Sequence, residues 1–272
     1  MVTKVAIVTL AVGETYLSRW KHHCERGWRN YAQNRGYDLV VIDKLIDETP
    51  RALARSPAWQ KCLILHPSIA GAYERIIWMD SDILINAGAP DVLDDVPLEM
   101  IGATDEHTFP TAEERRRIIM QLYLSWQRVN LKVAESWKSF LDAADWHAHW
   151  GLPRRGQAIV QTGVMVLSPR HHRDLFEHVY YNYEDNGGEP MNFEMRPMSF
   201  EIQERRLLHV LDHRFNALFS FLMIKKELEL RRQLTRNEVA ALMVSTFDQN
   251  YFLHLAGLKL SMDDLLPQIA AR

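Results

Sequence analysis

The sequence has few cysteines and no apolar run long enough to cross a membrane. Only two of the 272 residues are cysteines, Cys24 and Cys62, and neither stands in a Cys-x-x-Cys or Cys/His ligand spacing. This pattern disfavours a disulfide scaffold and favours buried thiols in a reducing compartment. The apolar segment at 1–13 is too short for a transmembrane span and carries no cleavage signal. We therefore expect a cytoplasmic protein without a transmembrane segment, in which peripheral membrane association through a partner or an acceptor remains open.

An excess of one charge is also missing. Lys and Arg number 32 against 35 Asp and Glu, which gives a formal net charge of −3. With such a balance, no overall electrostatic field points to a nucleic acid or to an anionic membrane. Local basic runs occur at helical spacing, where they usually form solvated helix faces. These runs are Arg115–Arg117, Arg154-Arg155, Lys225-Lys226 and Arg231-Arg232.

Short β-branched runs alternate with amphipathic segments along the chain, without repeats or low-complexity linkers. Strands are predicted over 4–10, 37–43, 75–82, 99–105, 157–169, 208–212 and from 251 onward. Helices are predicted over 14–35, from 56, from 170, over 198–207 and over 225–246. Alternation of this kind predicts an α/β fold with a mostly parallel central sheet flanked by helices. The segment at about 110–151 has helical periodicity and four tryptophans, and it predicts one or two inserted helices. We expect a single domain over 1–272, whose insertion forms an acceptor-binding face, a packed helical pair or a dimer contact.

Two acids stand where the third predicted strand ends. Asp80 and Asp82 follow the apolar run 76–79, and ligands of open α/β sheets bind at the carboxyl ends of strands. Only Ser81 separates them, so on an extended segment both carboxylates point the same way and repel each other unless a cation is present. A hard divalent cation, which also binds phosphate oxygens, removes this repulsion. Two surface turn acids would explain the pattern without a metal.

A third candidate ligand is His254, which ends the apolar stretch 251–253. The small residues Ala256 and Gly257 follow, and small residues let backbone amides approach a phosphate closely. Alone, such a histidine is more often a hydrogen-bonded core residue. Together with Asp80 and Asp82, it predicts a metal site.

Three segments in this order resemble the signatures of retaining GT-A glycosyltransferases: "WMDSD" (78–82), "QTGVMVLSP" (161–169) and "HLAGLK" (254–259). The chain resembles the glycogenin and bacterial lipopolysaccharide galactosyltransferase type and the fungal and plant α-galactosyl/mannosyltransferase type, over roughly 4–260 except the insertion. The resemblance implies a Rossmann-like nucleotide-binding sheet and a nucleotide-diphospho-sugar donor, with a UDP-sugar expected. It also implies that Asp80, Asp82 and His254 hold Mn²⁺ or Mg²⁺ against the diphosphate.

The resemblance further implies residues that contact the donor. They are Thr9, Leu10 and Ala11 at the base, Lys61 near the nucleotide, Ser81 between the two acids, Asp105 and Gln161 at the transferred sugar, and Gly257 and Lys259 at the diphosphate. A solvated helix lysine at Lys61 and a turn cap at Asp105 are the alternatives. Gln161 replaces the family's usual asparagine. The family's lysine stands one residue beyond Lys259 and is followed by Pro-Trp, which this chain lacks.

Retention of configuration needs a carboxylate nucleophile or an attack from the face that the leaving group departs from. The candidates are Glu194 and Glu201, in "NFEMRPMSFEIQERR" (192–206). Glu201 fits better by its distance to the following "LDHRFNAL", whose Asn216 also matches a family position. Solvated helix acids would explain both residues without a catalytic role.

The expected activity is metal-dependent transfer of a hexose from the nucleotide sugar to a saccharide, lipid-linked or other hydroxyl acceptor, with retention. One alternative is an inactive GT-A-fold protein that binds a sugar nucleotide or a glycan, because Phe200-Glu201 and the "HLAGLK" ending depart from the family's pattern. Another is a haloacid-dehalogenase-like phosphohydrolase. That class would place Asp-x-Asp after the first strand with Thr or Val beyond it, whereas Leu84 stands there in this chain. The sequence gives no indication of the oligomeric state.

Overall fold

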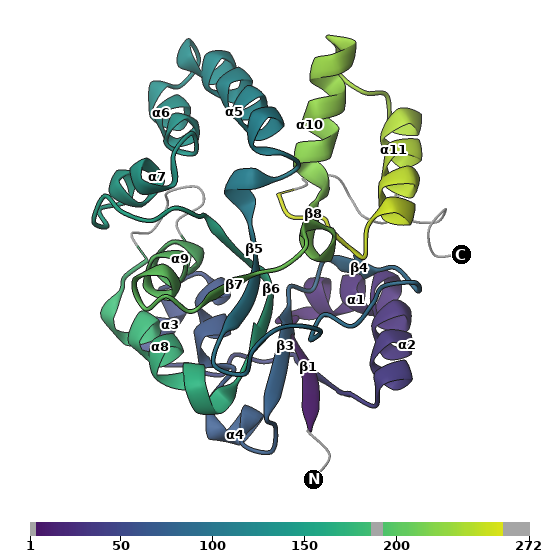
Figure 1. The fold of residues 1–272 in the computed structure, drawn as a ribbon, viewed down its shortest axis with the longest axis vertical. Coiled ribbons are helices and arrows are strands. Elements are labelled where there is room, and N and C mark those ends of the chain that lie inside the picture. Colours follow the sequence, from purple (N-terminus) through teal and green to yellow (C-terminus); the bar gives the residue numbers. More distant parts are fainter. Residues whose placement is uncertain (1–3, 186–192, 258–272) are drawn as a thin grey trace.

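A six-stranded sheet with the order β2-β1-β3-β6-β5-β7 forms the centre of the protein (Figure 1), in a computed structural model that describes residues 4–185 and 193–257. The strands are β1 (Val5–Leu10), β2 (Asp38–Ile42), β3 (Arg75–Met79), β5 (Ile101–Asp105), β6 (Val160–Leu167) and β7 (Leu208–Val210). β6 is antiparallel to both of its neighbours, β3 and β5, whereas the other pairings are parallel. The predicted mostly parallel sheet is confirmed.

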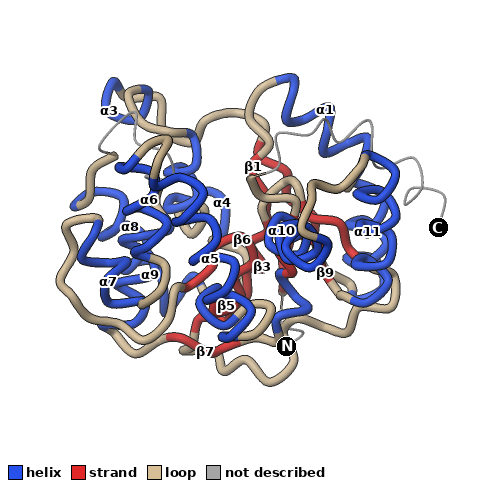
Figure 2. The backbone as a smooth tube through the Cα atoms, turned by 90° about the horizontal axis from the view of Figure 1, so that it is seen from above, coloured by secondary structure: helices blue, strands red, loops and turns tan. Residues whose placement is uncertain are grey.

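Helices cover both faces of this sheet, which explains why its strands are apolar on both sides. Ile76 and Trp78 of β3 face the core formed with α8 (Pro169–Asn182) and α9 (Met195–Glu204). Ile77 and Met79 face the opposite core, which includes α1 (Glu14–His23) and α2 (Glu25–Arg35). Figure 2 shows these two helical layers on either side of the strands. Cys24 lies between α1 and α2, so the single helix expected over 14–35 is two helices.

Short elements connect the sheet to the site. They are α3 (Pro50–Leu53), the 3₁₀ helix η1 (Pro57–Leu63), α4 (Pro67–Ala70), and the 3₁₀ helices η2 (Glu106–Thr108) and η3 (His213–Asn216). A second sheet has the order β4-β9-β8, with β4 (Ile83–Ile85), β9 (Phe252–His254) and β8 (Ala217–Leu218). β4 begins directly after Asp82, so this small sheet brings the last described strand beside the acids.

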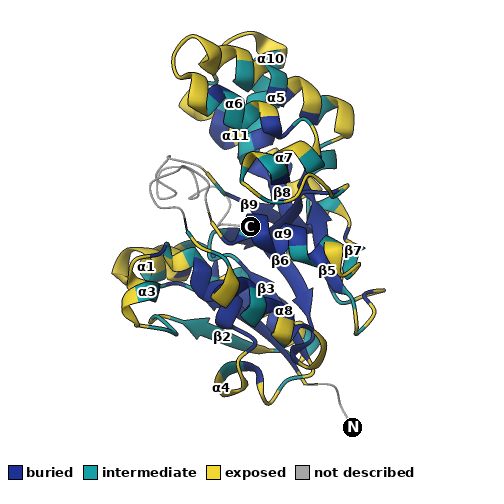
Figure 3. Ribbon diagram, turned by 90° about the vertical axis from the view of Figure 1, so that its left-hand side faces the viewer, coloured by how far each residue is buried: buried dark blue, intermediate teal, exposed yellow. Residues whose placement is uncertain are grey.

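Two groups of helices project from one end of the central sheet (Figures 1 and 3). The insertion forms three helices, α5 (Ala112–Gln127), α6 (Leu131–Ser139) and α7 (Ala143–His149), instead of the expected one or two. Asn130 and Asp142 explain the extra breaks, because their side chains cap the N-termini of α6 and α7. The segment expected to be helical over 225–246 is also two helices, α10 (Phe219–Leu230) and α11 (Arg236–Gln249).

The break between α10 and α11 begins at Arg231, whose φ of 55° is left-handed, and the capping box of Thr235 and Glu238 starts the next helix.

Among the described residues, no helix is both long and apolar enough to cross a membrane. Cys24 and Cys62 are buried free thiols, as expected. Burial raises the pKa of both thiols, which keeps them protonated.

Candidate functional site

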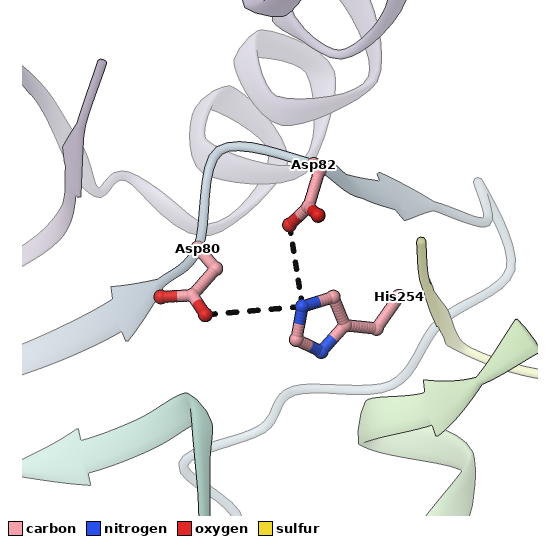
Figure 4. Close-up of side chains that lie close together, drawn as sticks. All are labelled: Asp80, Asp82 and His254. Carbon is pink, nitrogen blue, oxygen red and sulfur yellow. Dashed lines mark ion pairs between the residues drawn. The ribbon is translucent and has the colours of Figure 1, made fainter. Parts of the chain in front are cut away.

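Asp80, Asp82 and His254 lie together at the carboxyl edge of the central sheet (Figure 4). Nε2 of His254 is 3.2 Å from Oδ1 of Asp82 and 3.8 Å from Oδ2 of Asp80. Strand pairing explains this meeting of distant segments. Ile83 of β4 is opposite His254 of β9, and the N–H of Leu255 donates to the carbonyl of Asp82 at 3.1 Å. The predicted convergence of the three residues is therefore present.

The orientation of the His254 ring is fixed by Asn216, whose Oδ1 lies 2.8 Å from Nδ1. A carbonyl oxygen only accepts, so Nδ1 carries a proton and Nε2 faces the two acids. A neutral ring would then direct its lone pair at two carboxylates. Nε2 consequently needs either a proton or a metal ion.

The charges of the site agree with this requirement. Burial lowers the pKa of His254, but the charges of Asp82 and Asp80 and the contact with Asp82 together outweigh it, and the pKa is raised. Burial likewise raises the pKa of Asp82, but the charges of His254 and Lys61 and the hydrogen bonds to the carboxylate together outweigh it, and the pKa is lowered. Two carboxylates and an imidazole are a donor set that suits Mn²⁺. The residues present therefore fit a divalent cation in the place of the proton.

Gly163 provides the space for the His254 ring. A Cβ at position 163 would lie 2.3 Å from Cε1 and 2.6 Å from Nδ1 of His254. Because β6 is antiparallel, its beginning lies at the edge where β3 ends, and the carbonyl of Gly163 accepts from the N–H of Asp80 at 2.8 Å. Gln161 in turn accepts from the N–H of Gly163 through Oε1, at 2.7 Å. No role was predicted for Gly163 from the sequence, where the "QTG" segment was the signal available for it.

Lys61 is a buried cation that joins two acids of the site. Its Nζ lies 3.0 Å from Oδ1 of Asp80 and 2.8 Å from Oε1 of Glu194, and the residue is 5% exposed. The ammonium also donates to the carbonyl and the hydroxyl of Thr162, at 3.2 and 3.3 Å. Burial would lower the pKa of Lys61, but Asp80 and Glu194 outweigh it and raise the pKa above its ordinary value. This burial excludes the alternative of a solvated lysine.

Of the two candidate catalytic acids, the structure brings Glu194 and not Glu201 to Lys61. Glu194 precedes α9, is 2% exposed, and its buried Oε2 has no hydrogen-bond partner among the described residues. Glu201 lies two helical turns further, which is about 10 Å along the axis. It accepts from the hydroxyl of Tyr183 at 2.5 Å and pairs with Nε2 of His178 at 3.3 Å. The direction of α9 separates the two acids, and sequence spacing alone could not give that direction.

The residues expected at the base end β1, beside β3. Val8 is opposite Trp78 in the parallel register, so Thr9, Leu10 and Ala11 lie next to the segment that carries the two acids. Thr9 is fully buried, and its Oγ1 has no hydrogen-bond partner within the described part of the chain. Contact with a nucleotide base stays a prediction for all three.

The residues expected at the sugar lie on the adjacent strands β5 and β6. Oδ1 of Asp105 accepts from the N–H groups of His107 at 2.9 Å and Ile159 at 3.0 Å, so the carboxylate caps η2. The cap alternative for Asp105 is therefore present in the structure. Nε2 of Gln161 donates to Oε2 of Glu106 at 3.3 Å. Contact of Asp105 or Gln161 with a sugar stays a prediction.

Three expected donor contacts remain. Ser81 lies between the acids, and its carbonyl accepts from the thiol of Cys24 at 3.5 Å. Gly257 follows β9 with a φ of 73°, a left-handed conformation that suits glycine, and a Cβ there would contact none of the described residues. Lys259 lies outside the described residues.

Comparisons with known proteins were made for sequence and for structure. No family model and no curated protein matches the sequence. A glycosyltransferase involved in the glycosylation of the major capsid of PBCV-1 matches with a TM-score of 0.53 and 12% identity, over 98% of this chain and 100% of that one. The galactosyltransferase LgtC, in complex with donor and acceptor sugar analogues, matches with a TM-score of 0.51 and 11% identity, over 98% and 93%. The chain has the GT-A glycosyltransferase fold.

The bifunctional glycosyltransferase WbbM also shares this GT-A fold, with a TM-score of 0.55 and 11% identity, over 95% of this chain and 46% of that one. At identities this low, the structural matches establish the fold alone. They confirm the predicted fold class. In the GT-A fold of this chain the Asp-x-Asp pair follows β3, not the first strand. The phosphohydrolase alternative required the first strand, so the fold counts against it.

Proposed function

We propose that this chain is a metal-dependent glycosyltransferase. It transfers a hexose from a nucleotide-diphospho-sugar, expected to be a UDP-sugar, to a saccharide or other hydroxyl acceptor with retention of configuration. The observation that carries the proposal is the convergence of Asp80, Asp82 and His254 beside the buried Lys61–Glu194 pair. The glycosyltransferase structures that share the fold support it.

Asp80, Asp82 and His254 are the residues that would hold Mn²⁺ or Mg²⁺. A bound cation would stabilise the negative charge that develops on the leaving diphosphate. Asn216 keeps Nε2 of His254 directed at the ion site, because its Oδ1 holds the proton on Nδ1. Lys61 orients the Asp80 carboxylate from the other side through its contact with Oδ1. The ligands are thus preorganised by partners that do not bind the ion themselves.

Glu194 is the acid that we assign to the reacting sugar. Lys61 and Thr162 both contact its Oε1, at 2.8 and 3.2 Å, which fixes the side chain and leaves Oε2 for a ligand. Burying a carboxylate oxygen without a hydrogen-bond partner costs free energy. We infer that Oε2 contacts a hydroxyl group or the anomeric carbon of the bound sugar. Glu194 then acts either as the nucleophile or by orienting the sugar for same-face attack. We assign Glu201 no contact with the substrate.

The experiment is a donor screen with Mn²⁺ and UDP- or GDP-sugars, with hydrolysis and transfer measured separately. Turnover is expected for the wild type and for Asp174→Asn, an exposed acid on α8 that serves as the matched control. Asp82→Asn keeps the shape but removes a charged ligand, and we expect it and EDTA to abolish turnover. Turnover that survives both changes would contradict the proposal. Binding of donor and Mn²⁺ without turnover would establish the inactive alternative.

A further inference from the structure

The turns of two helical hairpins form one exposed surface at the end of the molecule farthest from the central sheet (Figures 1 and 3). We call it the tip surface, and it comprises residues 116–133 of α5 and α6 and residues 224–237 of α10 and α11. Near their beginnings, α5 and α10 are joined by an ion pair between Glu114 and Lys225 and by the Arg115 guanidinium, 3.8 Å from the centre of the Phe221 ring. Further along, a groove of about 900 Å³ separates the two helices.

The tip surface is apolar at its most exposed positions. Half of the large hydrophobic side chains that are exposed in the described residues lie there: Leu124, Trp126, Val129, Leu131 and Leu230. Val129 in the α5–α6 turn is 74% exposed, and Leu131 beside it is 60% exposed. Apolar side chains also line the groove: Met120, Leu124, Ile224 and Leu228. An apolar surface gathered from two separate parts of the sequence is typical of an interaction site.

The same surface is strongly basic, although the chain has a net charge of −3. It contains nine Arg and Lys residues and two acids, Glu227 and Glu229. Four arginines line the groove: Arg116, Arg117, Arg231 and Arg232. Arg232 pairs with Glu238, whereas Arg116, Arg117, Arg128 and Arg231 have no ion pair among the described residues. The one acid that lines the groove, Glu227, accepts from the N–H of Leu234 at 3.0 Å.

We propose that the tip surface docks onto an anionic phospholipid bilayer. Val129 and Leu131 enter the boundary between headgroups and acyl chains, Trp126 lies at the interface, and the arginines contact lipid phosphates. Apolar and basic side chains in this combination are typical of helices that lie on a membrane without crossing it. Each basic residue near an anionic surface adds to the attraction. This inference is independent of the proposed glycosyl transfer.

The positions of the apolar residues favour a bilayer over a nucleic acid. Val129 and Leu131 stand in and beside the turn between α5 and α6, whereas Arg116 and Arg117 lie nearer the beginning of α5. A nucleic acid would attract the arginines but would leave Val129 and Leu131 in water. A bilayer pairs the arginines with phosphates at its surface and takes Val129 and Leu131 out of water into the apolar layer beneath.

Vesicle co-sedimentation tests the proposal with phosphatidylcholine vesicles that contain or lack phosphatidylglycerol. We expect binding to the anionic vesicles only, decreasing with salt. Val129→Asp should weaken it about tenfold, and Arg128→Glu combined with Arg231→Glu should weaken it at least about thirtyfold. The controls are Val210→Asp, which replaces a 55% exposed valine on β7, and Arg170→Glu on α8. Both should bind as the wild type does.

Three results of the vesicle assay would overturn the proposal. They are no binding to anionic vesicles at low salt, binding that Val129→Asp leaves unchanged, and equal losses in the tip and control variants. A DNA duplex offered to the same proteins separates charge from insertion, since its binding should be weaker than vesicle binding and should fall less with Val129→Asp, which there adds one negative charge but removes no apolar contact. Duplex binding as tight as vesicle binding would contradict the bilayer assignment. Circular dichroism of every variant ensures that a loss of binding is not a loss of fold.

Discussion

Gly163→Ala is the substitution from which the geometry of the site makes its sharpest prediction. The added Cβ would lie 2.3 Å from Cε1 of His254, whereas ordinary contact begins at 3.4 Å, so the ring must move by about 1 Å. His254 is held at 2.8 Å from Asn216 and 3.2 Å from Asp82, and a displacement of this size breaks at least one of these contacts. No left-handed φ is present at Gly163, so the effect comes from the collision and not from backbone strain.

We expect Gly163→Ala to weaken Mn²⁺ binding about 10–100-fold, the range found when a ligand loses its orientation. Transfer should fall about 100-fold, as expected for a misplacement of about 1 Å. Isothermal titration calorimetry measures the affinity, and the donor assay measures the rate. The control is Gly88→Ala, whose Cβ would meet Oδ1 of Asn86 at an ordinary 3.5 Å. Wild-type Mn²⁺ affinity in Gly163→Ala would refute the assignment of His254 as a ligand.

Two further predictions concern stability, measured by urea unfolding without metal. Lys61→Met leaves the buried Glu194 unpaired and should cost about 3–5 kcal/mol; Lys138→Met, which removes an exposed pair, should cost less than about 1 kcal/mol. His172 is buried, and burial lowers its pKa to about 4. Its contribution, about 3 kcal/mol, is complete above pH 6.5 and is lost as pH falls towards 4, because the unfolded state binds the proton first. His172→Gln should flatten the fall in stability over this range by up to about 1.4 kcal/mol per pH unit.

Each stability prediction has an outcome that contradicts it. A Lys61→Met protein as stable as Lys138→Met would mean that Glu194 is not buried against the ammonium. For His172, the comparison is the slope of unfolding free energy against pH, since the lost hydrogen bonds to Ser168 and Glu99 lower stability at every pH. An unchanged slope in His172→Gln would show that this imidazole titrates as it does in the unfolded chain.

The convergence of Asp80, Asp82 and His254 was predictable because its signals are local. An apolar run that ends in Asp80 and Asp82 places both carboxylates at a strand's carboxyl end, and His254 ends a second apolar run in the same way. The sequence could not show how they meet, because that depends on the pairing of β4 with β9 across the whole chain. The resemblance of the three ordered segments to glycosyltransferase signatures was what predicted that His254 joins the two acids in one site.

The acids and the lysine show where prediction from sequence stops. Glu194 and Glu201 occupy similar helical sequence, and only the direction of α9 decides which one meets Lys61. The lysine in "AWQKCLIL" lies in a mostly apolar segment, but its burial depends on Asp80, which follows β3, and on Glu194, which precedes α9. Asn130 and Asp142 are typical N-cap residues, so the helix breaks there could be predicted from the sequence. The break at Arg231 could not, because no glycine, asparagine or proline stands there.

The most direct test of the central claim is a titration with Mn²⁺ in the presence of a nucleoside diphosphate, followed by electron paramagnetic resonance. We predict one tightly bound Mn²⁺ in the wild type and in the control Asp174→Asn. Asp82→Asn and His254→Gln should each lose it, because each removes one of the three ligands. A bound ion that keeps its affinity and its spectrum in both variants would contradict a metal site built from Asp80, Asp82 and His254.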